Sequence, residues 1–473
     1  MDSSPAGSSG TLARLADFAL GWREDAMPGE AFERAGDVVV DCIAAAICGA
    51  GDPGARAARL AATRGFGAGE DPIWFTHQTA PPAAALMANA AAASILDLDD
   101  GHRAAAGHPG AAIVPAVLAE AARIGAAPHD AAAAIITGYE IAVRMAAARD
   151  FSRLDTMSSG RWTHFGVVAA LARLRGLSRE TLTQALAIAG IHGPNQSASG
   201  YSKVMGSHTK EGIPWSALNG VLALDLAESG YSGPVDLVDH PDYYDAGALI
   251  AGLGREPRIL GTYFKPYSCC RWAHAPIDAL LALMRDHGFS PEAITRIEVA
   301  TFARALGLAN APAPQTLQAA QYSLPFTIAL AALRGGDALM PMREASLADP
   351  AVIALSGRVA LRIDPDREAA FPREAGASIT VETGEGSFTA CVTQPRGEPA
   401  NPMTRDDLMD KLVAVNRDRL RDKRRDGLLD GLLDALGRYL GNDGDTGAPA
   451  GLMAALADPA LVDPLLAEAQ PVS

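Results

Sequence analysis

The chain has little cysteine, few aromatic residues and a shortage of positive charge. Its 473 residues include five cysteines, an odd and low number that implies no disulfide framework, and they form no CxxC pair. Lysine and arginine number 40 against 55 aspartates and glutamates, so the formal net charge is −15. This balance argues against a nucleic-acid partner, which requires a basic face. An anionic substrate would need a local cationic pocket.

The sequence also lacks long apolar runs. Charges or glycines interrupt the apolar stretches before they reach membrane-spanning length, and the first residues carry no charged segment followed by an apolar one. We therefore expect a soluble, cytoplasmic protein with no membrane partner. Hydrophobic residues make up 49% and charged residues 20%, which is typical of a globular chain, and the length allows two or more domains.

Hydrophobic periodicity predicts helices through most of the first 261 residues. Aromatic residues are only 5% of the chain and alanine takes many of the apolar positions, so we expect helices in close contact. Glycine or proline stands at most of the joins. The predicted helices cover residues 11–20, 32–48, 55–64, 83–96, 110–125, 131–149, 164–174, 178–190 and 215–230.

The pattern changes after residue 278, where strands are expected. A turn at 384–386 would join the last two strands as a hairpin, and a helix is predicted over 319–333. Helices resume at residue 404, and we interpret the charged run 405–425 as a solvated helix face. The predicted strands cover residues 294–301, 359–363, 378–382 and 388–392.

These patterns predict a mainly α fold. Both chain ends, residues 1–271 and 400–473, would form one large all-helical domain. Residues 272–399 would form a small α+β domain inserted into it, with the position of a lid. A cleft between two such domains is a usual place for a small-molecule site.

Three carboxylates and two imidazoles follow the predicted helix 83–96. Burying such groups is unfavourable unless they pair or take part in chemistry. One interpretation is proton-transfer catalysis, with carboxylates that orient the imidazoles. The second is a site for Mg²⁺, Mn²⁺ or Zn²⁺, and the third is helix capping in a surface turn. The residues are Asp97, Asp99, Asp100, His102 and His108.

Two lysines and a histidine are further candidates. Lys265 lies in an apolar, aromatic loop at the predicted domain junction, and Lys210 lies in a polar linker before a helix. Each could bind a carboxylate as a point charge, or remain solvated. His274 follows Lys265 by nine residues and would either face the same cleft or sit in the core. No G-x-S-x-G, dinucleotide-binding or P-loop motif occurs, and Cys269 is interpreted as a packing residue.

The order and spacing of these segments resemble the MmgE/PrpD family over about residues 12–420. The resemblance implies an all-helical domain with an inserted lid, a homodimer, and no metal or organic cofactor. The segments that carry it are Asp97-Leu98-Asp99-Asp100 with His108-Pro109, His164-Phe165-Gly166, Thr209-Lys210, Tyr231-Ser232-Gly233-Pro234, Lys265-Pro266-Tyr267 with His274, and Tyr322-Ser323-Leu324-Pro325-Phe326.

The resemblance also implies a lyase or isomerase that moves a proton at a carbon next to a carboxylate. The substrate would be a small di- or tricarboxylate, and the family's reactions include dehydration of 2-methylcitrate, decarboxylation of cis-aconitate and epimerisation of iminodisuccinate. By motif, the active-site positions fall on Asp97, His108, Lys210 and Lys265. His108 would be the acid/base, oriented by Asp97 or its neighbours, and the lysines would hold substrate carboxylates.

One family element is missing. The usual His-Pro-Thr would fall near Met157, where no His-Pro stands, and His102 is a candidate for the second imidazole. Two alternatives to the lyase remain open: a metal-dependent hydrolase that uses the Asp/His cluster, and a non-catalytic homologue that keeps the fold. The predicted catalytic residues are Asp97, Asp100, His102, His108 and Lys265, and the predicted substrate-binding residues are Lys210, Lys265, His274, His164 and Tyr322.

Overall fold

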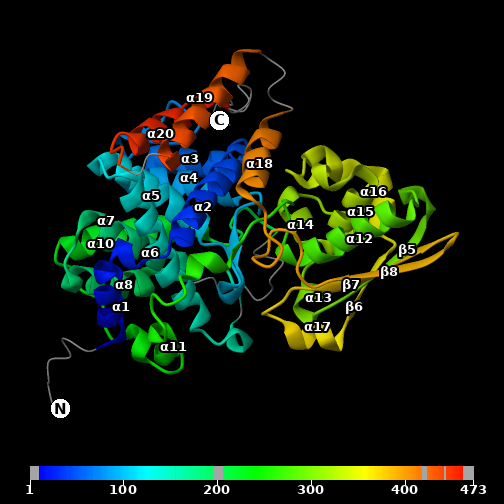
Figure 1. Cartoon of the computed structure of the whole chain (residues 1–473), viewed down its shortest axis with the longest axis horizontal. Coiled ribbons are helices and arrows are strands. Elements are labelled where there is room, and N and C mark those ends of the chain that lie inside the picture. Colours follow the sequence, from blue (N-terminus) through cyan, green and yellow to red (C-terminus); the bar gives the residue numbers. More distant parts are fainter. Residues whose placement is uncertain (1–9, 155, 195–205, 418–422, 442–443, 462–473) are drawn as a thin grey trace.

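The computed structural model describes residues 10–154, 156–194, 206–417, 423–441 and 444–461. The fold is mainly α, as predicted, and the largest sheet in this part of the chain has four strands. Figure 1 shows a helical part and a sheet-bearing part side by side, with α18 near the junction between them.

Each helix predicted in the first 261 residues is present, with ends that differ by a few residues. Two short antiparallel pairs, β1 with β2 and β3 with β4, lie among these helices. The elements are α1 (Thr11–Gly21), α2 (Gly29–Gly49), α3 (Pro53–Gly65), β1 (Asp71–Pro72), β2 (Thr79–Ala80), α4 (Pro82–Ser94), β3 (Gly101–His102), α5 (Gly110–Ile124), α6 (Pro128–Ala147), α7 (Thr163–Arg175), α8 (Arg179–His192), α10 (Ile213–Glu228), α11 (Ala246–Ile250) and β4 (Thr262–Tyr263).

Small residues let these helices approach closely. Helix α4 is alanine-rich and buried along nearly its whole length, where it contacts α2, α3, α5 and α10. Helices α6 and α7 cross at Gly138 and Gly166; a Cβ at Gly166 would lie 2.7 Å from the Gly138 carbonyl oxygen. Such contacts exclude any larger side chain at the crossing, because protein interiors are close-packed. The predicted close helix packing is therefore confirmed.

The sheet-bearing part follows. Its sheet has the order β6-β5-β7-β8, with β5 parallel to β6 and the other neighbours antiparallel, and the predicted β7–β8 hairpin is present. Helix α12 packs on β7 and β8. The elements are α12 (His274–His287), β5 (Ile294–Thr301), α13 (Ala303–Leu306), α14 (Leu317–Gln321), α15 (Leu324–Arg334), α16 (Pro350–Ser356), β6 (Val359–Ile363), α17 (Pro365–Ala370), β7 (Ala377–Thr383) and β8 (Gly386–Val392).

The helix predicted over 319–333 was wrong as a single element. Helix α14 ends at Gln321 and α15 begins at Leu324. Ser323 caps α15, because its Oγ accepts a hydrogen bond from the Phe326 N–H (3.2 Å), and Pro325 occupies the first turn. The break leaves Tyr322 outside both helices.

Buried apolar side chains form two separate clusters. One draws on residues 12–264 and on residues 403–461, and the other on residues 269–381.

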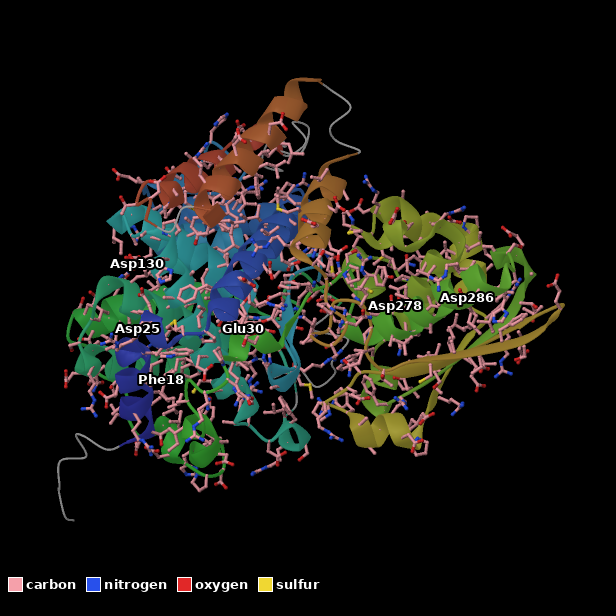
Figure 2. All side chains as sticks on the ribbon, viewed as in Figure 1. Phe18, Asp25, Glu30, Asp130, Asp278 and Asp286 are labelled. Carbon is pink, nitrogen blue, oxygen red and sulfur yellow. The ribbon has the colours of Figure 1, made fainter. Side chains whose placement is uncertain are left out.

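Figure 2 shows Asp278 on α12 nearer to the helical part than Asp286. The Asp278 carboxylate accepts hydrogen bonds from the Tyr267 hydroxyl (2.9 Å) and the Arg396 backbone N–H (2.8 Å). It therefore links α12 to the segment of chain that enters the sheet-bearing part and to the segment that leaves it.

The C-terminal helices α18 (Arg405–Arg417), α19 (Lys423–Gly441) and α20 (Ala448–Leu456) return to the helical part, where α18 packs on α2. The interpretation of the charged run as a solvated face was wrong at Lys411. This side chain is fully buried, and its Nζ lies 2.7 Å from Asp41 Oδ1 and donates to the Leu98 carbonyl oxygen at 2.8 Å. Residues 418–422 of the run lie outside the described residues.

In the described part of the chain, no single helix is both long and apolar enough to cross a membrane, and α2 and α3 meet that test only as a pair bent by 95°.

Candidate active site

The connection between α4 and α5 carries the predicted acidic cluster. It turns at Asp97, whose backbone adopts a left-handed conformation (φ 53°), a strained choice for a residue other than glycine. Strand β3 then pairs with β4, and Gly101 lies against the Tyr263 ring, since a Cβ there would be 2.3 Å from the Tyr263 hydroxyl. The chain that leaves β4 therefore brings Lys265 to Asp97.

Asp97 lies between two cationic partners. Its Oδ2 is 2.9 Å from Lys265 Nζ, and its Oδ1 is 3.4 Å from His108 Nε2. Burial favours the neutral acid, but Lys265, Lys210 and His108 outweigh it and hold the pKa of Asp97 below its usual value. Asp97 is therefore a buried carboxylate with compensated charge.

His108 is fixed in one orientation just before α5. Its Nδ1–H donates to the Asp100 carbonyl oxygen (2.6 Å), and its backbone N–H donates to Ser159 Oγ (2.8 Å). Burial lowers the pKa of His108, but the carboxylates of Asp99, Asp97 and Glu211 outweigh burial, so the net shift is upward. The ring therefore holds a proton more readily than a free histidine, with Nε2 as the atom left for chemistry.

Asp97 and His108 line a pocket between the two parts of the molecule, whereas Lys265 and Lys210 are not among its lining residues. The pocket is mixed in character, with charged side chains and aromatic rings on its walls, as small-molecule sites often are. It is lined by Asp97, His102, Arg103, Ala106, His108, Glu211, Tyr263, Cys270, Arg271, Trp272, Tyr322, Phe371 and Pro372.

Two arginines supply positive charge to this pocket. Arg103 and Arg271 both form ion pairs with the buried Glu398, and both guanidinium groups lie over the Tyr263 ring, at 5.1 and 4.7 Å from its centre. Sequence reasoning missed these three charged residues, as well as Glu211. Their contacts join positions far apart in the chain, so no local motif reveals them.

Comparison with known proteins identifies the family of the chain. The profile of the MmgE/PrpD N-terminal domain matches residues 13–249, and that of the MmgE/PrpD C-terminal domain matches residues 267–435. The chain belongs to the MmgE/PrpD family. Two relatives, each named cis-aconitate decarboxylase and both from Aspergillus terreus, one of them from strain NIH 2624 / FGSC A1156, are 28% identical over 319 residues. The match covers 61% of this chain and 62% of each relative, which is less than two thirds of the relatives' length.

Within this family framework, Asp100 lies behind the pocket wall. Its Oδ1 accepts from the Gly110 N–H at the start of α5 (2.9 Å), and its Oδ2 accepts from the Tyr139 hydroxyl (2.6 Å). Burial raises the pKa of Asp100 to about 7. The structure thus places Asp100 as a support for α5 and, through its carbonyl, for the His108 ring.

His102 lines the pocket, but both ring nitrogens are occupied. Nε2–H donates to the Arg258 carbonyl oxygen (2.8 Å), and Nδ1 accepts from the Ala104 N–H (3.2 Å). Burial lowers its pKa to about 4, so the ring is neutral. This arrangement suits a structural role better than the predicted catalytic one.

The structure does not bring His274 and His164 to the pocket lining. His274 accepts from Arg271 Nη1 (3.0 Å) and donates to the Cys269 carbonyl oxygen (3.2 Å), so it orients a pocket arginine. His164 belongs to α7 and contacts α10, with its Nδ1 3.0 Å from Ser216 Oγ. Burial lowers the pKa of both imidazoles, that of His164 to about 3.

Lys210 and Tyr322 meet at the pocket edge. Lys210 Nζ lies 5.8 Å from the centre of the Tyr322 ring, which is part of the lining, and donates to the carbonyl oxygens of Ser94 (3.2 Å) and Ile95 (2.9 Å) at the end of α4. Its positive charge therefore stabilises the carbonyl groups at the C-terminal end of α4 and also adds to the positive potential at the edge of the pocket.

Proposed function

We propose that the chain is a cofactor-independent lyase that transfers a proton at a carbon next to a carboxylate of a small di- or tricarboxylate. The observation that carries the proposal is the buried Asp97 carboxylate between Lys265 and His108, beside a pocket that also presents Arg103 and Arg271. The Aspergillus terreus relatives, named for decarboxylation of cis-aconitate, support this substrate class. Dehydration of the 2-methylcitrate type is our first candidate, and epimerisation is the other fate of the same carbanion. Decarboxylation is the third candidate, and it differs because protonation accompanies the loss of CO₂.

In this proposal His108 is the proton donor. The surrounding carboxylates favour its imidazolium, and Nε2 is the nitrogen that the Asp100 carbonyl leaves unused. Lys265 and Lys210 stabilise the negative charge that develops on the substrate carboxylate, an effect of about 3–4 kcal/mol for a well-placed donor. Closure of the 272–399 segment over the pocket would exclude water and strengthen these interactions.

A metal-dependent hydrolase is the second candidate, and one observation favours it. Asp97, Asp99 and His108 each offer a ligand atom, and these atoms lie within 4.8 Å of one another. Lys265 Nζ weighs against it, because an ammonium group 2.9 Å from Asp97 Oδ2 already supplies the positive charge that a divalent ion would bring. The donor set therefore fits a lyase better.

Proton NMR in D₂O, with chelator present, tests the proposal. We would incubate the protein with 2-methylcitrate, citrate, cis-aconitate, and hydroxy- and amino-succinates. A new alkene signal, loss of CO₂ or α-deuterium exchange would support the lyase, and light scattering would test the homodimer that we also propose. Turnover that appears only without chelator, with near-stoichiometric zinc or manganese, would instead favour a metal-dependent enzyme that uses the Asp/His cluster. No turnover in either condition would favour a non-catalytic homologue.

A further inference from the structure

Glu211 places a second carboxylate in the pocket beside His108. Its side chain is 7% exposed and belongs to the pocket lining together with Asp97 and His108. Glu211 and Asp97 are the two carboxylates in that lining, and Asp97 already forms an ion pair with Lys265. A pocket for an anionic substrate gains nothing from an extra negative charge, so the carboxylate of Glu211 calls for a chemical role.

One carboxylate oxygen of Glu211 accepts hydrogen bonds from Ser159, and the other accepts none from the described residues. Oε2 accepts from the Ser159 N–H (2.7 Å) and the Ser159 hydroxyl (3.0 Å), while Ser159 Oγ accepts from the His108 N–H (2.8 Å). No residue in the described part of the chain donates a hydrogen bond to Oε1. Ser159 thus holds Glu211 and the backbone of His108 in one fixed relation, with Oε1 available.

The backbone around Glu211 is held in a strained conformation. Lys210, which precedes it, is a non-glycine residue with a positive φ of 39°, whereas Gly212, which follows it, adopts its φ of 68° without strain. The Glu211 carbonyl oxygen accepts from the Gly160 N–H (2.7 Å), and a Cβ at Gly160 would lie 2.5 Å from that oxygen. Strain of this kind persists where the surroundings over-determine a position, and it is common at functional sites.

We propose that Glu211 is the general base of the lyase and that His108 is the acid that works with it. This inference rests on the proposed function and narrows it to dehydration. Glu211 takes the proton from the carbon next to the substrate carboxylate, and that C–H electron pair forms the new C=C bond. The C–O bond on the neighbouring carbon breaks, and the hydroxyl leaves as water with the Nε2 proton of His108. The products are an unsaturated carboxylate, protonated Glu211 and neutral His108, and one proton shift between the two resets the site.

The pair of Glu211 and His108 discriminates between dehydration and decarboxylation. A decarboxylase needs no base at this carbon, because the electron pair comes from the bond to the departing CO₂. A dehydratase needs one group to accept a proton and one to supply it. Burial raises the pKa of Glu211 above that of a free glutamate, which makes its carboxylate a stronger base.

The test compares Glu211→Gln, Glu211→Asp and the control Glu256→Gln, which changes an exposed glutamate outside the pocket. In Glu211→Gln the amide oxygen of the new side chain can still accept from Ser159, so the fold should be kept, as circular dichroism and the melting temperature would show. Dehydration of citrate and 2-methylcitrate is followed by proton NMR. We expect kcat to fall about 10²–10⁴-fold in Glu211→Gln with KM nearly unchanged, partial recovery in Glu211→Asp, and wild-type kcat in the control.

Other results would overturn the inference. Dehydration by Glu211→Gln within about tenfold of wild type would remove Glu211 from the mechanism, although the lyase would stand. Decarboxylation of cis-aconitate by the wild-type protein without dehydration would do the same. A wild-type protein that turns over none of the acids tested for the proposed function would contradict the lyase itself, and the base with it.

Discussion

The pocket and the interior between α7 and α10 each bury a histidine, but the two imidazoles differ in charge preference. His108 is surrounded by carboxylates that raise its pKa against the effect of burial. His164 has a serine hydroxyl at Nδ1 and the Phe165 ring beside it, and burial lowers its pKa to about 3. Burial alone therefore makes a histidine neutral, and only carboxylates brought close by the fold make it a proton donor.

Two fully buried lysines, Lys265 and Lys411, extend the comparison. Lys265 pairs with Asp97 at the pocket, whereas Lys411 of α18 pairs with Asp41 of α2 and donates to the Leu98 carbonyl oxygen. The ion pairs are alike in distance, at 2.9 and 2.7 Å. Only Lys265 contacts Asp97, the carboxylate that faces His108. Lys411 instead supports the connection between α4 and α5 through the Leu98 carbonyl oxygen.

The largest expected effect follows from replacing His108. His108→Asn keeps a side-chain N–H for the Asp100 carbonyl but removes Nε2, so turnover should fall at least about 10³-fold. NMR assays of the carboxylate panel would measure it, with His240→Asn, an exposed position, as the control. An unchanged circular dichroism spectrum is required for the interpretation. Retention of most activity by His108→Asn would show that the raised pKa has no catalytic purpose.

Lys411→Met should affect stability more than chemistry. It leaves the Asp41 carboxylate buried without its cation, which typically destabilises by about 3–5 kcal/mol. Urea denaturation would measure the loss, and kcat at a temperature where the variant is folded should change far less than in His108→Asn. A stability equal to wild type would show that the two buried ion pairs are not comparable.

Much of this fold was predictable because the relevant signals are local. Apolar spacing gave the helices of the first part, and period-two alternation gave β5 to β8. The break at Tyr322 was missed because the apolar pattern runs through it, while Ser323 and Pro325 start a new helix there. Lys411 was misjudged because its partner, Asp41, is 370 positions away.

The site residues likewise divide into those that a local segment predicts and those that depend on tertiary contacts. Asp97 and His108 could be predicted because one short segment carries both. His102 stands in that segment too, yet only the tertiary partner of its ring, the Arg258 carbonyl, distinguishes it from His108. Arg103, Arg271 and Glu398 could not be predicted, because their meeting depends on how the two parts of the molecule come together.

The smallest effect expected at neutral pH is that of His164→Gln. The ring does not line the pocket, so turnover at pH 7 should stay within about twofold of wild type. Its folded-state pKa is about 3 against 6.5 in the unfolded chain, so below pH 6.5 the unfolded state binds the extra proton. This histidine therefore makes the free energy of unfolding fall by about 1.4 kcal/mol per pH unit as the pH drops from 6.5 toward 3.

Urea titrations at pH 7, 6 and 5 should show a shallower decline in His164→Gln than in wild type. Parallel declines would mean that His164 is protonated in the folded protein, and the contrast with His108 would then disappear.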